Sequence, residues 1–154
     1  MLSPRELMDV ALKTFVVPAL RESGFTGAYP HFRRVRVTHV ELLTFQFDIN
    51  GGGFLIEISR CGVGGVTTPV GKHIPAAMVR AWDLHANDRF RLKPGEGAGT
   101  ASWFRYESGE YDNVANEVLG KLPVAYNYWS QRGKERINDL DEAGPADGVP
   151  TRSA

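Results

Sequence analysis

Residues 42–59 read LLTFQFDINGGGFLIEIS, and this stretch decides the fold. On each side of the glycines, large apolar residues stand at every second position, which is the pattern of a β-strand with one buried face. Asn50 and the three glycines after it tolerate the backbone angles of a tight turn. A four-residue turn at 50–53 predicts three cross-strand pairs: Ile49 with Phe54, Phe47 with Ile56, and Phe45 with Ile58. Both apolar sets then lie on one face, so the stretch predicts an antiparallel hairpin.

More strands are expected before and after this hairpin. Three are predicted, over 32–37, 89–93 and 101–107. In the first of them, alternation places Val35 and Val37 toward the core. Arg34 and Arg36 then point away from the core. The chain between the hairpin and the later strands is expected to form a loop over 62–75 and a short helix over 76–85.

A helix is expected at the start of the chain. Ser3 is a good capping residue, Pro4 suits the first helical position, and Glu6 completes a capping box with Ser3. These signals predict a helix over 3–23. It should bend near Pro18, because proline lacks the amide donor that a helix interior needs.

A second helix is expected toward the other end. A broad apolar stripe predicts it over 111–130, with a kink at Pro123. After Gly133 the periodicity disappears, so 133–154 is interpreted as a flexible C-terminal tail and 1–132 as a single domain. The order of helix, antiparallel sheet of about four to five strands, and helix predicts an α+β fold with both helices on one sheet face.

Composition excludes several classes of protein. The chain has 154 residues, with 18 Lys and Arg against 18 Asp and Glu, and 42% hydrophobic residues. This balance argues against a disordered chain, a fibrous rod and a strongly basic protein that coats nucleic acid. No run of about 20 apolar residues is present, and the start of the chain lacks the apolar stretch of a signal peptide. We therefore expect a cytoplasmic protein without membrane contact.

No motif in the sequence carries a recognisable catalytic chemistry. The 4 histidines, at 31, 39, 73 and 85, lack the spacing of a metal-binding helix. Cys61 is the only cysteine, which excludes a disulfide framework, and it is interpreted as a small buried residue. Gly71-Lys72 is followed by His73, where a phosphate-binding loop needs Ser or Thr. The sequence therefore predicts no catalytic residue, no metal site and no cofactor.

The sheet face away from the helices is the candidate interaction surface. It is expected to carry these partner-binding residues: Arg34, Arg36, Gln46, Glu57, Arg91, Trp103 and Arg105. Arginine and tryptophan are common anchors in protein interfaces. The same residues also suit a solvated face of paired charges. They suit an RNA-binding face less well, because the net charge of the chain is zero.

An alternative is a small enzyme or a small-molecule binder. Its site would lie under the 62–75 loop and would use His73, Asp83, His85 or Glu57. A ligand bound in such a site would stabilise the native state. The sequence leaves this alternative open, and it does not determine the oligomeric state.

Several short motifs resemble a family of small bacterial proteins. They are VPAL at 17–20, GF at 24–25, FRR at 32–34, FQF at 45–47, GF at 53–54, RFRL at 89–92 and WF at 103–104. Over most of its length the chain is similar to the family known as Domain of Unknown Function 4304. The resemblance implies a small, single-domain, cytosolic protein with no established reaction, so it supplies no catalytic residues.

Size and architecture add an expectation about function. Small α+β bacterial proteins without catalytic motifs often serve as binding partners, including immunity proteins that neutralise toxins. We therefore expect a non-enzymatic protein-interaction module of the immunity type, with another protein such as a toxin as its partner.

Overall fold

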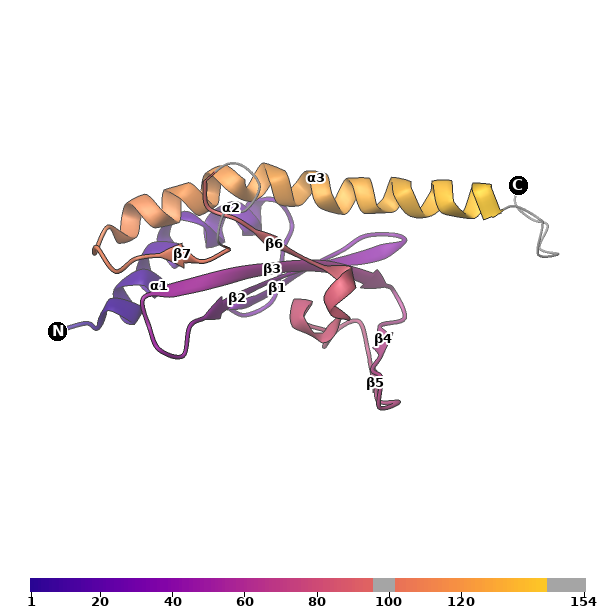
Figure 1. Cartoon of the computed structure of the whole chain (residues 1–154), viewed down its shortest axis with the longest axis horizontal. Coiled ribbons are helices and arrows are strands. Elements are labelled where there is room, and N and C mark those ends of the chain that lie inside the picture. Colours follow the sequence, from indigo (N-terminus) through magenta and orange to yellow (C-terminus); the bar gives the residue numbers. More distant parts are fainter. Residues whose placement is uncertain (96–101, 144–154) are drawn as a thin grey trace. The chain divides into compact units, whose positions relative to one another are not determined.

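The computed structural model describes residues 1–95 and 102–143, with side chains described as far as Gln131 in the last helix. Its helices and strands are α1 (Pro4–Phe15), α2 (Val17–Glu22), β1 (His31–Val35), β2 (His39–Phe47), β3 (Gly53–Gly62), β4 (Val66–Thr67), β5 (His73–Ile74), the 3-10 turns η1 (Ala81–Asp83) and η2 (Ala86–Asp88), β6 (Arg89–Leu92), β7 (Phe104–Arg105) and α3 (Tyr111–Ala143). This order confirms the predicted α+β fold (Figure 1). None of the described helices is long and apolar enough to cross a membrane.

The main sheet is antiparallel throughout. Its strand order is β1-β2-β3-β6, and β7 pairs with β3 beside the end of β6. The strands predicted near 32–37 and 89–93 are therefore present, although β1 already ends at Val35. Of the strand predicted over 101–107, only β7 forms, and Ala101 lies outside the described residues.

The β2–β3 hairpin is confirmed, but the predicted register differs from the observed one by two residues. The observed pairs are Phe47 with Phe54, Phe45 with Ile56, and Leu43 with Ile58. The strands are joined by 48–52, where Asn50 donates its amide to Asp48 Oδ1 at 2.9 Å and Gly51 and Gly52 have φ of +87° and +84°. A shift by two residues keeps every side chain on its predicted face. Ile49, predicted to pair in the strand, is instead 97% exposed.

The first helix begins as predicted and is then interrupted. Ser3 Oγ accepts the amide of Glu6 at 3.1 Å, and Glu6 Oε1 accepts the amide of Ser3 at 2.8 Å, so the capping box is present. The predicted bend near Pro18 is a break at Val16, between α1 and α2. Pro18 lies in the first turn of α2, where its missing amide costs no hydrogen bond.

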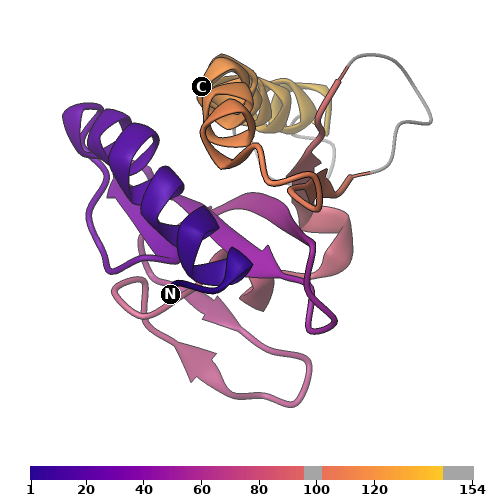
Figure 2. The same ribbon diagram turned by 90° about the vertical axis from the view of Figure 1, so that its left-hand side faces the viewer.

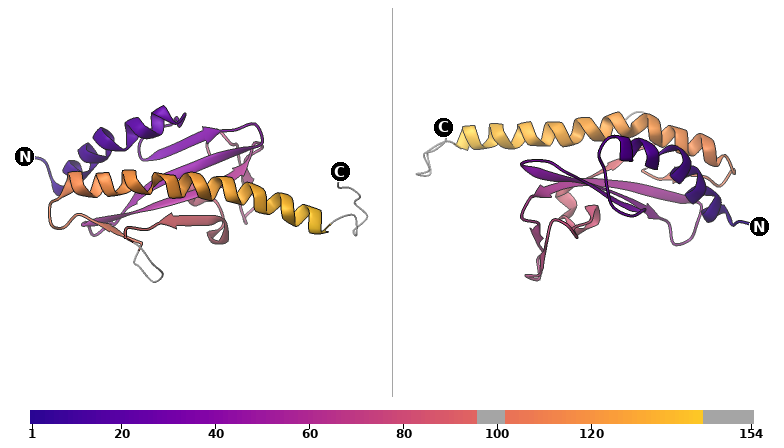
Figure 3. Two further views of the ribbon diagram at one scale, coloured as in Figure 1. Left: turned by 90° about the horizontal axis from the view of Figure 1, so that it is seen from above. Right: turned by 180° about the vertical axis from the view of Figure 1, so that it is seen from behind.

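One face of the sheet packs against helices. Figure 2 shows α1 and the start of α3 on the same side of the sheet, and Figure 3 shows the two lying over this face, as predicted. The face is aromatic: the rings of Phe54 and Phe104 stack with centroids 5.3 Å apart. Tyr29 joins the sheet to α1, since its hydroxyl donates to Asp9 Oδ1 at 2.7 Å.

Residues 1–122 form one compact unit and residues 123–154 form a second one. Helix α3 runs through Pro123 and continues to Ala143, beyond the predicted end near Ser130. The proposed division into a domain over 1–132 and a tail over 133–154 stays a prediction. The site described below lies wholly within the first unit.

The opposite sheet face is partly covered, which the sequence did not indicate. The β4–β5 hairpin and both 3-10 turns lie on the side of the sheet away from α1 (Figure 1). The β4–β5 hairpin and η1 belong to a second, smaller core, whose buried residues are Val40, Leu42, Cys61, Val79 and Ala81. The helix predicted over 76–85 is wrong, because Ser59 Oγ donates to the Ala81 carbonyl at 3.1 Å and holds that residue against the sheet.

Candidate functional site

A row of polar residues crosses the face opposite the helices. Its members lie directly opposite one another on successive strands: His31 on β1, Thr44 on β2, Glu57 on β3 and Arg91 on β6. Thr44 is 0% exposed and Glu57 only 2% exposed. Polar side chains buried in the middle of a sheet are unusual unless they are paired, and such departures from a simple core gather at functional sites.

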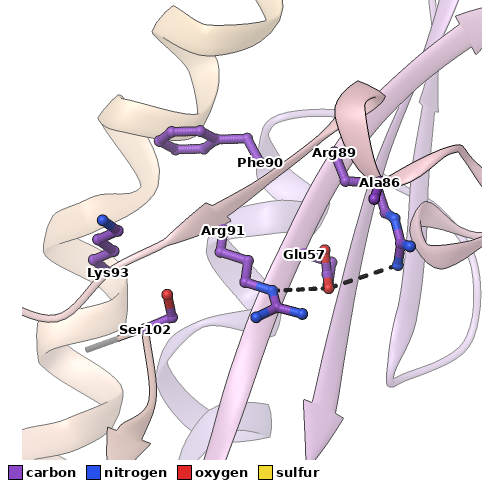
Figure 4. A pocket seen from close by; sticks show the side chains of 7 residues that line it. All are labelled: Glu57, Ala86, Arg89, Phe90, Arg91, Lys93 and Ser102. Atoms are coloured by element: carbon purple, nitrogen blue, oxygen red, sulfur yellow. Dashed lines mark hydrogen bonds and ion pairs between the residues drawn. The ribbon is translucent and has the colours of Figure 1, made fainter. Parts of the chain in front are cut away.

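Glu57 is the centre of the row and organises two arginines. Arg91 Nε donates to Glu57 Oε2 at 3.1 Å, and Arg89 Nη1 lies 3.7 Å from the same oxygen. Figure 4 shows the two guanidinium groups reaching Glu57 from different sides. The side chain of Arg91 remains 49% exposed, whereas that of Arg89 is 26% exposed. The buried carboxylate therefore contacts one arginine that is mostly buried and one that is half exposed.

A hollow of about 420 Å³ opens beside this pair of arginines. It is lined by Glu57, Ala86, Arg89, Phe90, Arg91, Lys93 and Ser102 (Figure 4). Three cationic side chains against one carboxylate leave the lining with a net positive charge. Arg89 Nε is buried and finds no acceptor among the described residues. The hollow thus favours an anionic group with several hydrogen-bond acceptors.

The other end of the row is neutral in character. His31 Nδ1 lies 3.0 Å from Thr44 Oγ1, and the Trp82 ring meets the His31 ring edge-on at 4.7 Å. Burial lowers the pKa of His31 below its usual value, and the neighbouring Arg80 lowers this pKa further. The neutral imidazole is therefore favoured, and positive charge is concentrated at the Arg91 end of the row.

The structure divides the predicted partner-binding residues into two groups. Gln46, Glu57, Arg91 and Arg105 occupy strand positions that alternate onto the face with the polar row. Trp103 stays with them, since the Arg105 guanidinium lies 5.3 Å from the centre of its ring. The placement of these residues on one face agrees with the prediction.

The predicted placement of Arg34 and Arg36 on that face is wrong. Arg34 pairs with Glu41 at 2.7 Å, donates to the Ser23 carbonyl at 2.9 Å and lies over the Phe25 ring, on the helix-covered side. Its side chain is only 14% exposed. Arg36, in the turn after β1, joins the same cluster at 3.6 Å from Glu41.

The reversal in β1 has a simple cause. Val35 and Val37, predicted to face the core, are 67% and 95% exposed. Phe32 is 2% exposed and occupies the core position, and alternation then turns Arg34 to the same side. Phe32 was the better guide to the face of this strand than the two valines, because it buries more apolar area.

Only two of the four residues named for the alternative site share a hollow. His73 and Asp83 line a separate hollow of about 400 Å³, and neither Glu57 nor His85 is among its lining residues. Asp83 Oδ2 accepts the amide of Arg80 at 2.8 Å, and His85 Nδ1 accepts the amide of Asn87 at 3.1 Å. Among the side chains that the structure describes, in 1–95 and 102–131, no three of His, Cys, Asp or Glu come together as a metal site.

Several site residues were not identified from the sequence. They are His31, Thr44, Arg89, Lys93 and Ser102. The predicted register placed Gln46 opposite Glu57, whereas Thr44 lies there. The available signal was a polar residue inside each of the two apolar strands, Thr44 in β2 and Glu57 in β3, and the correct register would have placed these two opposite each other.

Comparison with known proteins gives one match. The model of the family described as a domain of unknown function, DUF4304, matches residues 16–131, a range that contains the whole polar row and the hollow beside it. No curated protein and no solved structure matches the chain.

Proposed function

The chain belongs to the DUF4304 family, whose description names no activity, and from this premise we propose that it is a non-enzymatic protein-interaction module. The proposed binding surface is the arginine strip, defined as Arg91, Arg105 and Trp103 on the outer side of β3. The partner is a protein that supplies acidic side chains, and we place the interaction in the cytoplasm.

The observation that carries this proposal is that two arginines are anchored and still accessible. Glu57 holds Arg91, and Asp48 Oδ2 lies 3.9 Å from Arg105 Nη1. The two arginine side chains are 49% and 48% exposed. An anchored guanidinium loses less conformational entropy on binding than a free one, and its remaining donors suit a carboxylate.

The spacing of the strip suits a single contact patch. Arg91 pairs with Glu57 and Arg105 pairs with Gly53, so the two arginines lie beside positions four residues apart on β3. That separation is about 13 Å along a strand, well within one interface of ordinary size. Trp103 beside Arg105 adds an aromatic anchor of the kind that dominates binding energy.

The first test is capture of the partner from the cells that encode this protein. The tagged wild type, the double variant Arg91→Glu/Arg105→Glu, and the control Lys72→Glu would be compared, followed by mass spectrometry. Lys72 is an exposed lysine between β4 and β5, so Lys72→Glu reverses a surface charge that lies outside the arginine strip. We expect one stoichiometric partner on the wild type and the control, and its loss from the double variant.

Two outcomes would contradict the proposal: equal retention by all three proteins, or no partner on any of them. Circular dichroism and urea unfolding would first establish that the double variant is folded. If the partner is a toxin, as the immunity interpretation holds, co-expression with the wild type should restore growth. Co-expression with the double variant should not.

A second candidate function is ligand binding in the hollow that contains His73 and Asp83. Its volume of about 400 Å³ is the observation in its favour, because small-molecule sites are commonly of this size. A rise in melting temperature with one compound of a metabolite panel, lost in His73→Ala, would support it. No rise with any compound would count against it.

A further inference from the structure

We propose that the hollow beside Glu57 is a binding site for a small doubly charged oxyanion of the phosphate class, specifically a phosphate monoester of a small organic molecule. The hollow is defined by Arg89, Arg91, Lys93 and Ser102 around Glu57. This binding does not depend on the proposed protein partner, because it needs only groups that the isolated chain already holds in place.

The first argument is the supply of uncommitted donors. Arg91 gives its Nε to Glu57, which leaves its two terminal nitrogens for a ligand. Arg89 makes no hydrogen bond through its side chain to any described residue, and its contact with Glu57 is an ion pair at 3.7 Å. Lys93 likewise makes no ion pair with other described residues. Ser102 adds a hydroxyl to the lining, on the side of the hollow where Figure 4 shows Lys93.

The second argument is charge. Two arginines, one lysine and one carboxylate line the hollow, so the lining carries two positive charges beyond neutrality. A dianion balances this excess, whereas a single carboxylate would leave it half compensated. Guanidinium and ammonium groups are also the groups that proteins use most often to hold phosphate.

The third argument is the origin of the geometry. Glu57 is almost completely buried, yet it sits where a sheet would gain more stability from an apolar residue. What the carboxylate achieves is to fix Arg89 and Arg91 on either side of itself. The free end of β6 is fixed as well, since Glu117 Oε2 accepts the Gly95 amide at 3.1 Å and Lys121 Nζ donates to the Gly95 carbonyl at 2.6 Å.

The fourth argument is size. A volume of about 420 Å³ exceeds what inorganic phosphate alone would fill, and the lining includes the apolar residues Ala86 and Phe90. A phosphate monoester uses both kinds of group, with its dianion on the cations and its organic portion against either Phe90 or Ala86, which Figure 4 shows well apart. Monoesters lose their second proton near pH 6, so they are dianions at neutral pH.

The test is titration of the isolated full chain with glycerol phosphate and with inorganic phosphate, followed by two-dimensional NMR of the backbone amides. We expect saturable shifts at 89–93 with both anions, and weaker binding below pH 6. Sulfate, which stays doubly charged, should keep its affinity over the same pH range. Lys93→Gln should weaken binding about tenfold, the loss expected for one charged partner.

Glu57→Gln is the variant that tests the charge argument most directly. The glutamine side chain keeps an oxygen that can accept from Arg91 Nε, so the arginine stays in place while the like charge beside the ligand is lost. Anion binding should therefore tighten at least about threefold. Lys72→Gln is the matched control and should bind as the wild type does. If Glu57→Gln does not fold, Lys93→Gln and Arg91→Gln decide the question, since both change exposed side chains.

The proposal is overturned if neither anion gives saturable shifts at concentrations up to about 50 mM, far above a millimolar Kd. It is also overturned if Lys93→Gln and Lys72→Gln weaken binding equally, which would indicate only a diffuse charge effect. Because the measurement uses no partner protein, its failure is separate from failure of the capture experiment.

Discussion

The two faces of one sheet are built on different principles, although the same strands supply both. On the helix-covered face, rings such as Phe45, Phe54 and Phe104 fill the space, and each is at most 1% exposed. On the opposite face, a small apolar cluster that includes Leu42 lies next to two polar residues, Thr44 and Glu57. These two side chains are also almost completely buried. Because successive side chains of a strand point to opposite faces, the residues of one face can differ in kind from those of the other.

The difference shows which face contributes most to stability. Burial of large rings contributes most of the favourable free energy of a domain of this size. A buried carboxylate with two arginines contributes little by comparison, because desolvation offsets much of the attraction between the charges. The helix-covered face therefore contributes most of the stability of the fold, and the charged residues of the opposite face contribute less.

The largest expected effect is on the aromatic face. Phe54→Ala should lower the free energy of unfolding by about 3–5 kcal/mol, because it leaves a cavity against Phe104. Phe90→Ala is the control, since Phe90 is already 39% exposed and should cost about 1 kcal/mol. Urea denaturation measures both. Equal losses in the two variants would show that the stacked pair is not the centre of the core.

A smaller effect is expected on the polar face. Glu57→Gln should cost only about 1–2 kcal/mol, because the partner Arg91 is half exposed and can be hydrated. The difference from wild type should shrink in about 1 M NaCl, where charges are screened within about 3 Å. A loss as large as that of Phe54→Ala would mean that this face also carries the stability of the fold.

The smallest expected effect concerns pH and His31. The pKa of His31 is lower in the folded chain than the ordinary 6.5, so the unfolded chain binds its proton more readily. Stability should therefore be fully present above about pH 6.5 and should fall as the pH drops below that value. Urea unfolding between about pH 5 and 7 measures the slope, and His31→Asn should reduce it. An unchanged slope in the variant would assign the pH dependence to other groups.

Much of the aromatic face could be predicted because its signals are local. The alternation of Phe45 and Phe47 with polar neighbours identifies the strand and its buried face without knowledge of any other segment. The register was missed because it depends on the turn, and the Asp48 side chain extends that turn by capping Asn50. The predicted buried face was still correct, because a register shift of two residues leaves each side chain on the same face.

The polar row could be predicted only in part. Glu57 and Arg91 were recognised as residues of one face, but Arg89 and Lys93 belong to the site through tertiary position alone. Arg34 was assigned to the wrong face, because two valines suggested an inward direction that Phe32 decides instead. The covering segment 62–88 has no periodicity of its own, and its contacts with β2 and β3 give it its structure.

The sequence by itself determined the order of the long helices and strands, the capped first helix, the hairpin and the identity of the aromatic face, since each depends on neighbours within a few residues. Only the tertiary structure decided that His31, Thr44, Glu57 and Arg91 form one row, because they come from four strands whose registers must all be correct at once. Local preference shapes each strand, but the placement of charge between strands arises from their pairing.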